Sequence, residues 1–351
     1  MKKYFGFAAV LVAALCSAPL FGQEFTSVDD VKADGKYVDA FQIQGEYVDE
    51  TNHRGYQVIA RGEKDFVVVG YQDGLPGDGW DRSKARFFGK GEFKDGQLVV
   101  TGEKMNIPRK GDEADVIFND AQKARVLHGT FEDGKYYFDF GKKVEIKRVE
   151  RKSPTLGMKA PEGAIVLFDG SNTDAFDGKV NVSDKQENAI WSEARLKPFE
   201  KDRPYTLHME FMLSFMPNAT GQARSNSGVY LQEEYECQVL DSFGLEGENN
   251  ECAGFYQQLK PIVNACFPPL TWQTYDFDVT PAKFNDKGEK IANAVITVKH
   301  NGILVHDKAE LAHETPGGKT EKTEAGEARG VFLQGHGNKV QYRNIWIKYN
   351  D

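Results

Sequence analysis

Hydrophobic and polar residues alternate with a period of two along much of the second half of the chain. The alternation is clear at 206–215, 294–300 and 340–348. It is typical of strands with one buried face, because successive side chains point to opposite sides of a sheet. The Asn301-Gly302 pair after one of these runs favours a tight hairpin turn. Helical periodicity is nearly absent, so the pattern predicts an all-β domain, either a two-sheet sandwich or a jelly roll.

The first half of the chain also shows short β patterns. A strand is predicted at 66–71, and hairpins at 91–100 and 129–138 each carry an Asp-Gly pair at the turn. A weaker copy of the hairpin pattern lies at 33–38. These repeats predict a meander of hairpins that share one sheet, in a small β-rich domain at 24–150.

A change in composition separates the two halves. Residues 151–163 are polar and contain two prolines, which is typical of a linker. We therefore expect two domains, with the sandwich at 164–351.

Residues 1–22 have the composition of a secretory signal peptide. Lysines precede an apolar run that ends at Leu15, and small residues follow as far as Gly22. No later stretch approaches the about 18 apolar residues of a membrane helix. Leu15 is larger than the residue that usually precedes a lipidated cysteine, so we do not expect a lipid on Cys16. The sequence predicts an exported protein, periplasmic or extracellular, with no membrane span.

The charge balance limits the partners. The 351 residues contain 53 acidic and 44 basic side chains, a net charge of −9. Loss of the two lysines in the signal peptide leaves 42 basic against 53 acidic side chains, or about −11. Nucleic acids and anionic membranes select basic surfaces, so neither is an expected partner.

Three cysteines follow the predicted signal peptide, and export permits disulfide bonds. Cys252 and Cys266 are the candidate pair, since a bridge between them would close a short loop. Cys237 lies in a strand-like run, where we expect a buried free thiol. The spacing contains neither a CxxC pair nor a zinc signature.

The densest group of polar side chains lies between Arg224 and Asp241. If one regular strand runs through this segment, Glu234, Glu236 and Gln238 project from one face and apolar residues from the other. Carboxylates and amides in a row can bind sugar hydroxyls and supply acid and base groups. A solvated outer face is the alternative. Asp241 falls on the apolar side of the alternation, which indicates a strand end or a bulge.

His336 stands between two glycines, in a turn where the backbone can approach a ligand closely. A histidine so placed is a candidate general base or metal ligand, with a structural role as the alternative. Tyr256 and Lys260 add polar groups nearby in the sequence. The chain has no G-x-S-x-G, H-E-x-x-H or P-loop motif, which argues against a serine hydrolase, a zincin and an NTPase.

Motifs of the second half resemble, in order, those of the 3-keto-disaccharide hydrolase domain family. They are LFDG at 167–170, SNSGVYL at 225–231, YECQVLD at 235–241, WQTYD at 272–276, HNG at 300–302, LQGHG at 333–337 and YRNIWI at 342–347. The resemblance spans about 163–349 and leaves out 24–150. It departs from the family at 174–177, where a Leu-Gly-Trp-like turn is usual.

The resemblance implies a concanavalin-like β-sandwich that acts on glycosides already oxidised at C3. A C3 ketone acidifies the proton on C2, so one base can form an enolate that expels the C1 aglycone. Hydration of the resulting 3-keto-2-hydroxyglucal completes a net hydrolysis. Two other classes stay open, a non-catalytic carbohydrate-binding module and a conventional glycoside hydrolase. The latter would show two opposed carboxylates.

Carried onto this chain, the resemblance implies Glu236, His336 and Asp241 as catalytic residues, with Glu236 or His336 as the base. Arg224, Lys260 or a divalent cation would polarise the ketone oxygen. Glu236 and His336 would hold such a cation, and Mg, Mn, Ca and Zn are all chemically admissible. The expected substrate-binding residues are Arg224, Glu234, Gln238, Tyr256, Lys260 and Gln334.

Overall fold

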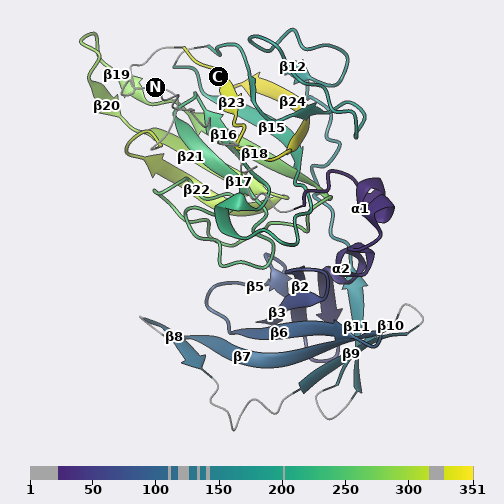
Figure 1. Ribbon diagram of the computed structural model, residues 1–351. Helices are drawn as coiled ribbons and strands as arrows, with labels where there is room; N and C mark the ends of the chain where they lie inside the picture. The colour runs from purple at the N-terminus through teal and green to yellow at the C-terminus, as the bar shows by residue number, and fades with distance from the viewer. Residues whose placement is uncertain are drawn as a thin grey trace, which may run out of the picture.

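The computed structural model describes residues 23–109, 112–117, 126–132, 135–139, 143–200, 202–315 and 328–350. The predicted signal peptide and its cleavage site lie outside these residues. An N-terminal β-barrel and a C-terminal β-sandwich lie one below the other in Figure 1, and an irregular segment after Val149 connects them. No helix in the described part of the chain has the length and apolar character needed to span a membrane.

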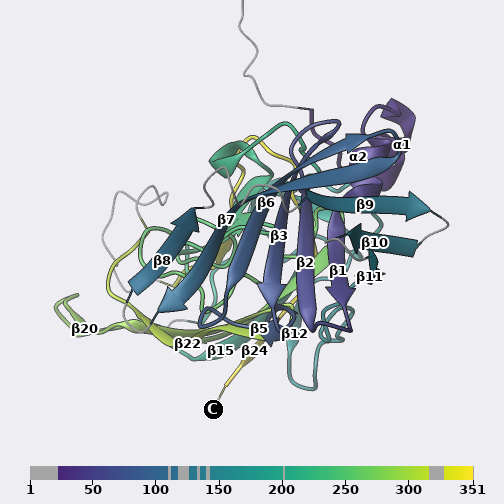
Figure 2. The same ribbon diagram turned by 90° about the horizontal axis from the view of Figure 1, so that it is seen from below.

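The N-terminal half is a nearly continuous antiparallel meander. Its strands are β1 (Gly45–Asp49), β2 (Arg54–Ala60), β3 (Asp65–Gln72), β6 (Arg86–Lys94), β7 (Gln97–Arg109), β8 (Asp112–Ile117), β9 (Val126–Glu132), β10 (Lys135–Asp139) and β11 (Lys143–Val149). The order across the sheet is β6-β3-β2-β1-β11-β10-β9-β7-β8, and β6 also pairs with β7. That extra pairing closes the sheet into a barrel and leaves β8 as an extension beside it (Figure 2). A short parallel pair, β4 (Leu75–Pro76) and β5 (Gly79–Trp80), lies between β3 and β6.

The predicted hairpin at 91–100 is confirmed, and so is the strand pairing of the one at 129–138, whose turn residues 133–134 lie outside the described residues. Strands β6 and β7 pair around Asp95 and Gly96, whose φ angles of 53° and 74° suit the tight turn that an Asp-Gly pair favours. Strands β9 and β10 pair in the same antiparallel way.

The prediction of a hairpin at 33–38, which rested on a weaker copy of the pattern, is wrong. The segment holds two short helices, α1 (Val28–Asp34) and α2 (Val38–Ile43). The Ser27 side chain accepts a hydrogen bond from the Asp30 amide and so caps the start of α1. Gly35 ends that helix in the left-handed conformation, at φ 76°. The Asp-Gly pair that suggested a hairpin is therefore a helix end.

The C-terminal half is the predicted all-β sandwich. The larger sheet contains β12 (Ile165–Phe168), β13 (Ile190–Trp191), β15 (Tyr205–Met212), β18 (Trp272–Thr280), β21 (Ala294–His300), β22 (Ile303–Leu311) and β24 (Gln341–Tyr349). The smaller sheet has the order β14 (Ala194–Arg195), β23 (Val331–Leu333), β16 (Asn226–Leu231) and β17 (Tyr235–Leu240). A small hairpin pairs β19 (Lys283–Phe284) with β20 (Lys290–Ala292), and a 3-10 helix, η2 (Gly221–Ala223), precedes β16.

The main core lies between the two sheets of the sandwich. Leu207 and Phe211 of β15 face Val229 and Val239 of the smaller sheet, and all four are fully buried. These positions follow the alternation seen in the sequence, because a period of two places every second side chain inside. The cluster extends into the barrel through Ile59 and other side chains, so the two halves share apolar contacts.

Polar contacts also join the barrel to the sandwich and to the segment between them. Arg151, just after β11, forms an ion pair with the buried Glu46 of β1, with a nitrogen to oxygen distance of 2.5 Å. Arg86 of β6 pairs with Glu246 in the sandwich. Arg82 donates a hydrogen bond of 2.6 Å to the carbonyl of Gly247. The loop that follows β17 is thus held from the barrel side.

Candidate active site

The segment that was expected to form one regular strand is a hairpin. Strands β16 and β17 pair with each other, and Gln232 to Glu234 form the turn between them. Gln232 and Glu233 both have positive φ angles, 53° and 58°, although neither is a glycine. Glu234 therefore does not lie in the row of polar side chains. Its carboxylate pairs with Arg329 at 2.9 Å.

The hairpin keeps the expected separation of faces beyond its turn. Val229 and Cys237 point into the core, whereas Tyr230, Glu236 and Gln238 project from the opposite face. That face borders a cavity of ≈ 260 Å³. The cavity is lined by Gln222, Asn226, Tyr230, Glu236, Gln238, Tyr256, Gln334 and His336.

Glu236 carries the only carboxylate among the described residues of this lining, and it is 3% exposed. Burial raises its pKa to about 7, against a lowering effect of the hydrogen bond that the Tyr230 hydroxyl donates at 2.9 Å. The absence of a side chain at Gly228 makes room for this carboxyl group. A Cβ atom there would lie 2.2 Å from Glu236 Oε1.

Two glutamine side chains each have an amide oxygen that accepts no hydrogen bond within the described structure. Gln238 donates through Nε2 to Gln222 Oε1 at 3.0 Å, and Gln334 donates to the Tyr230 hydroxyl at 3.3 Å. The Oε1 atoms of Gln238 and Gln334 are buried and have no hydrogen-bond partner within the described structure. Buried polar atoms are nearly always paired, so these two oxygens are suited to accept hydrogen bonds from a hydroxylated ligand.

His336 and Tyr256 complete the rim. His336 is exposed in the turn that follows β23, and the neighbouring Gly335 packs closely against Glu193. The partly buried Tyr256 is held by its backbone amide, which donates to the Glu236 carbonyl at 3.1 Å. The structure thus brings together five predicted residues, which are Glu236, Gln238, Tyr256, Gln334 and His336.

Arg224 and Asp241 lie outside this lining. Arg224 is 1% exposed and donates from Nε to Asp241 Oδ2 at 2.6 Å. It also donates to the carbonyl of Ala60 in the barrel at 3.1 Å. The geometry is that of a structural ion pair, and it corrects the expectation that these two residues face the substrate. Lys260 is exposed and also lies outside the lining.

The expected bridge between Cys252 and Cys266 is not formed, and this prediction is corrected. Both are free, buried thiols, as is Cys237. Cys252 Sγ lies 3.2 Å from the hydroxyl of Tyr275, and Cys266 Sγ contacts the carbonyl of Phe267 at 3.4 Å. The two thiols also interact with each other through a side-chain hydrogen bond.

Glu236 and His336 are the two cavity residues that could ligate a cation. Three or more His, Cys, Asp or Glu side chains do not converge anywhere in the described residues. The remaining lining residues offer amide and hydroxyl oxygens, which would make weak additional ligands for Mg²⁺ or Ca²⁺. We therefore derive no step through a metal ion.

Sequence reasoning missed Gln222, Asn226 and Tyr230 in this lining. Tyr230 faces Glu236 only because the chain reverses between them, and the turn contains no Gly, Asn or Pro that would reveal it. Asn226 lies at the start of β16 and donates to the Gln222 carbonyl at 2.8 Å.

One sequence family and two solved structures are similar to part of this chain. The sequence model of the 3-keto-alpha-glucoside-1,2-lyase-like domain matches residues 163–348. No curated protein matches the chain. A crystal structure of a proposed glycosyl hydrolase from Parabacteroides distasonis ATCC 8503 is 27% identical, with a TM-score of 0.47, over 54% of this chain and 85% of the other. A second proposed glycosyl hydrolase from the same organism is 18% identical, with a TM-score of 0.38, over 54% and 95%.

The sandwich and the match to this domain define a carbohydrate-active enzyme. More particularly, the chain belongs to the 3-keto-alpha-glucoside-1,2-lyase-like domain family, whose model covers slightly more than half of its residues.

Proposed function

We propose that the protein cleaves 3-keto-glucosides by elimination followed by hydration. One observation carries the proposal. Glu236 is a single buried carboxyl group with a pKa of about 7, and it faces a polar cavity that also contains His336. A base with that pKa is half deprotonated near neutral pH, which suits removal of a proton next to a ketone.

The steps balance without an oxidant or reductant. Glu236 takes the proton from C2, and the electron pair forms the C1–C2 double bond as the C1–O bond breaks. The leaving oxygen takes a proton, for which His336 at the cavity rim is the available donor. Water then adds to C1 of the 3-keto-2-hydroxyglucal, and C2 regains a proton. The products are a free 3-keto-glucose and an alcohol.

Other cavity groups support binding of the oxidised sugar. The Oε1 atoms of Gln238 and Gln334 can accept hydrogen bonds from ring hydroxyls. The hydroxyl of Tyr256 can donate to the C3 oxygen, a role that the sequence assigned to Arg224 or Lys260. Donors placed at a developing enolate oxygen lower the barrier to its formation.

A conventional glycosidase requires two carboxyl groups on either side of the scissile bond. The described lining of this cavity provides Glu236 alone. The elimination route needs a single base, and it is therefore the reaction that this set of side chains fits better.

Parallel incubations test the proposed activity. The purified protein is given a 3-keto disaccharide or its unoxidised parent, with and without a chelator, and released sugar and enone absorbance are followed. Cleavage of the keto substrate alone supports the proposal, whereas cleavage of the parent would indicate a conventional glycosidase. Binding measured by calorimetry without turnover of either sugar would indicate a carbohydrate-binding module.

A further inference from the structure

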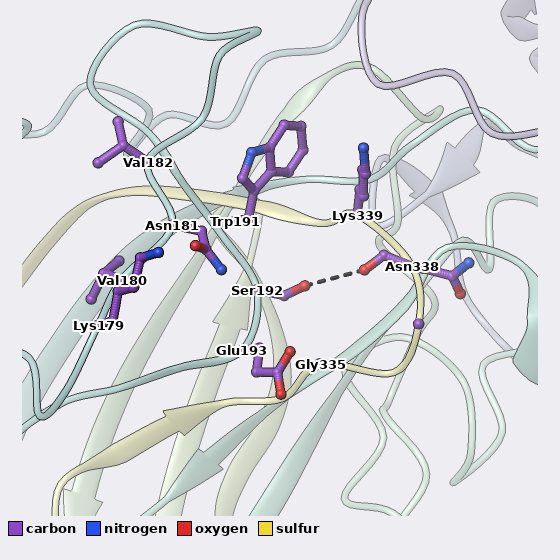
Figure 3. A pocket seen from close by; sticks show the side chains of 11 residues that line it. Lys179, Val180, Asn181, Val182, Trp191, Ser192, Glu193, Gly335, Asn338 and Lys339 are labelled. Carbon is purple, nitrogen blue, oxygen red and sulfur yellow. Dashed lines mark hydrogen bonds between the residues drawn. The ribbon is translucent and has the colours of Figure 1, made fainter.

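A second cavity, of ≈ 640 Å³, lies beside the first. It is lined by Lys179, Val180, Asn181, Val182, Trp191, Ser192, Glu193, Gly335, Gly337, Asn338 and Lys339. Figure 3 shows Trp191 and Lys339 standing next to each other on one side, with Val180 and Val182 on the other. None of its side chains takes part in the reaction described above.

The two cavities share one turn of the chain. Gly335 and Gly337 line the larger cavity, and His336 between them lines the smaller one. A ligand that occupied both would therefore pass over His336. In a glycoside, the group that lies between the two halves is the C1–O bond that breaks.

The wall of the larger cavity is firmly attached to this turn. Ser192 donates through Oγ to the Asn338 carbonyl at 3.2 Å, and the amide of Glu193 donates to the Leu333 carbonyl at 2.8 Å. Trp191, the last residue of β13, pairs with Gln341 of β24. The backbone of Trp191 is therefore fixed relative to the turn that carries His336.

The side chains that line the larger cavity suit a ring that carries polar substituents. Trp191 offers a partly exposed indole, and Val182 on the other side of the cavity is 62% exposed. The ammonium group of Lys339 lies 5.7 Å from the centre of the indole ring. Lys339 and Lys179 can donate hydrogen bonds to hydroxyl or other oxygen acceptors around the edge of a bound ring.

We propose that this cavity binds the leaving group of the glycoside, an aryl ring or a pyranose ring whose face stacks on Trp191 while the keto sugar occupies the smaller cavity. The inference rests on the proposed function for the identity of the ligand. It adds that the enzyme prefers substrates whose leaving group is a ring, and that His336 lies at the boundary where the leaving oxygen needs a proton.

The test compares leaving groups on one keto sugar. Phenyl, glucosyl and methyl 3-keto-glucosides are assayed with the wild type and with Trp191→Ala. We expect the variant to lower the preference in kcat/KM for the phenyl or glucosyl substrate over the methyl substrate by about fivefold to tenfold, the size of a lost ring contact. The larger of the two losses identifies whether the ring is an aryl group or a sugar. Trp272→Ala is the matched control, because Trp272 packs under Arg343 and lines neither cavity.

A binding measurement separates this inference from the proposed activity. Unoxidised phenyl glucoside is titrated into both variants, and its affinity is measured by calorimetry. Weaker binding to Trp191→Ala than to Trp272→Ala, without turnover of any keto substrate, would support the subsite and refute the lyase. Turnover of keto substrates with an unchanged leaving-group preference in Trp191→Ala would overturn the subsite and leave the lyase intact.

Discussion

At the scale of single residues, the proposed chemistry depends on the carboxyl group of Glu236. Its environment combines burial, one hydrogen bond from Tyr230 and the space left by Gly228. Burial disfavours the charged form of a carboxyl group, and this is the main reason why the pKa reaches about 7. A solvated glutamate on the same strand would be fully ionised at neutral pH and would be a weaker base.

The pH dependence of turnover should report this pKa. Because a general base acts in its deprotonated form, kcat/KM for a 3-keto-glucoside should rise about tenfold per pH unit below pH 7 and level off above it. Glu236→Gln should lower kcat/KM by about 10²–10⁴-fold. The exposed Glu248→Gln is the control and should change little. A wild-type profile that falls as pH rises through 7 would instead make Glu236 a general acid.

The same carboxyl group should reduce stability at alkaline pH. Its folded-state pKa of about 7 lies above the ordinary value of 4.5, so the folded state binds more protons between these values. The free energy of unfolding therefore falls as pH rises from about 4.5 to about 7. We expect Glu236→Gln to be more stable than the wild type by about 3 kcal/mol at pH 8, and by little near pH 4. Urea unfolding at both pH values measures the difference, and equal stability at pH 8 would show that the ionised group is well solvated.

At the scale of elements, the segment at 153–158 is fixed to the outer face of the larger sheet. The amide of Gly157 donates to Glu210 Oε1 at 2.6 Å, and Asn344 donates to the Met158 carbonyl at 3.0 Å. Burial alone would raise the pKa of Glu210. Hydrogen bonds from His208, Asn344, Arg343 and the Gly157 amide lower it to about 2. Thr155 of the same segment also donates to Asp276 Oδ2 at 2.7 Å, so two carboxylates of the sheet hold the chain between barrel and sandwich.

Removal of that carboxylate should be costly. Glu210→Ala removes the buried carboxylate that Arg343, Asn344 and the Gly157 amide share, and we expect a loss of about 3–5 kcal/mol in the free energy of unfolding. The pKa of Glu210 is depressed from 4.5 to about 2, so its contribution is complete above pH 4.5 and is lost as pH falls toward 2. Burial lowers the pKa of His208, but hydrogen bonds to Asp276 and Glu210 raise it above 6.5, so the loss of Glu210 also removes stability that is present below that pH. The deficit of the variant should therefore be at least as large at pH 5 as at pH 7. Exposed Glu310→Ala provides the control, and a deficit below about 0.5 kcal/mol would mean that the cluster adds no stability.

Elements with local signals could be predicted from the sequence. The hairpins around Asp95-Gly96 and Asn301-Gly302 are specified by residues that tolerate positive φ angles. The turn at Gln232 and Glu233 has the same backbone form without those residues, so the hairpin that places Tyr230 opposite Glu236 gave no signal. The helices at 28–43 were missed because they are short and end at a glycine that also fits a turn.

At the scale of the whole molecule, the barrel supports the loop that borders the cavity. Arg224 lies between η2 and β16, and it joins Asp241 of the sandwich to the carbonyl of Ala60 in the barrel. Gln222 and Asn226 on either side of it line the cavity. Sequence reasoning placed Arg224 at the substrate, because nothing in the local sequence identifies a partner 164 positions earlier.

A double-mutant cycle tests this support. Arg224→Met and Asp241→Asn should each destabilise the protein by about 3–5 kcal/mol, because each leaves a buried charge or donor without its partner. The two effects should be non-additive by more than about 1 kcal/mol, which unfolding of the single and double variants in urea measures. Additive effects would show that the pair does not act as a unit.

The Arg224→Lys variant distinguishes a structural role of Arg224 from direct contact with the substrate. A positioning role predicts a lower kcat that follows lost stability, with KM for the keto substrate changed little. A direct contact with the ketone, as the sequence suggested, predicts a raised KM in a stably folded variant. The second outcome would contradict the placement of Arg224 outside the cavity.

The most direct test of the proposed elimination is hydrogen exchange at C2. A 3-keto-glucoside is cleaved in D₂O, and the released 3-keto-glucose is trapped by borohydride reduction and examined by mass spectrometry and NMR. Elimination and hydration predict one deuterium at C2 in every product molecule formed by the wild type, above the exchange seen without enzyme. Product that retains its original hydrogen at C2 would show that the C1–O bond breaks without C2 deprotonation, and would contradict the role proposed for Glu236.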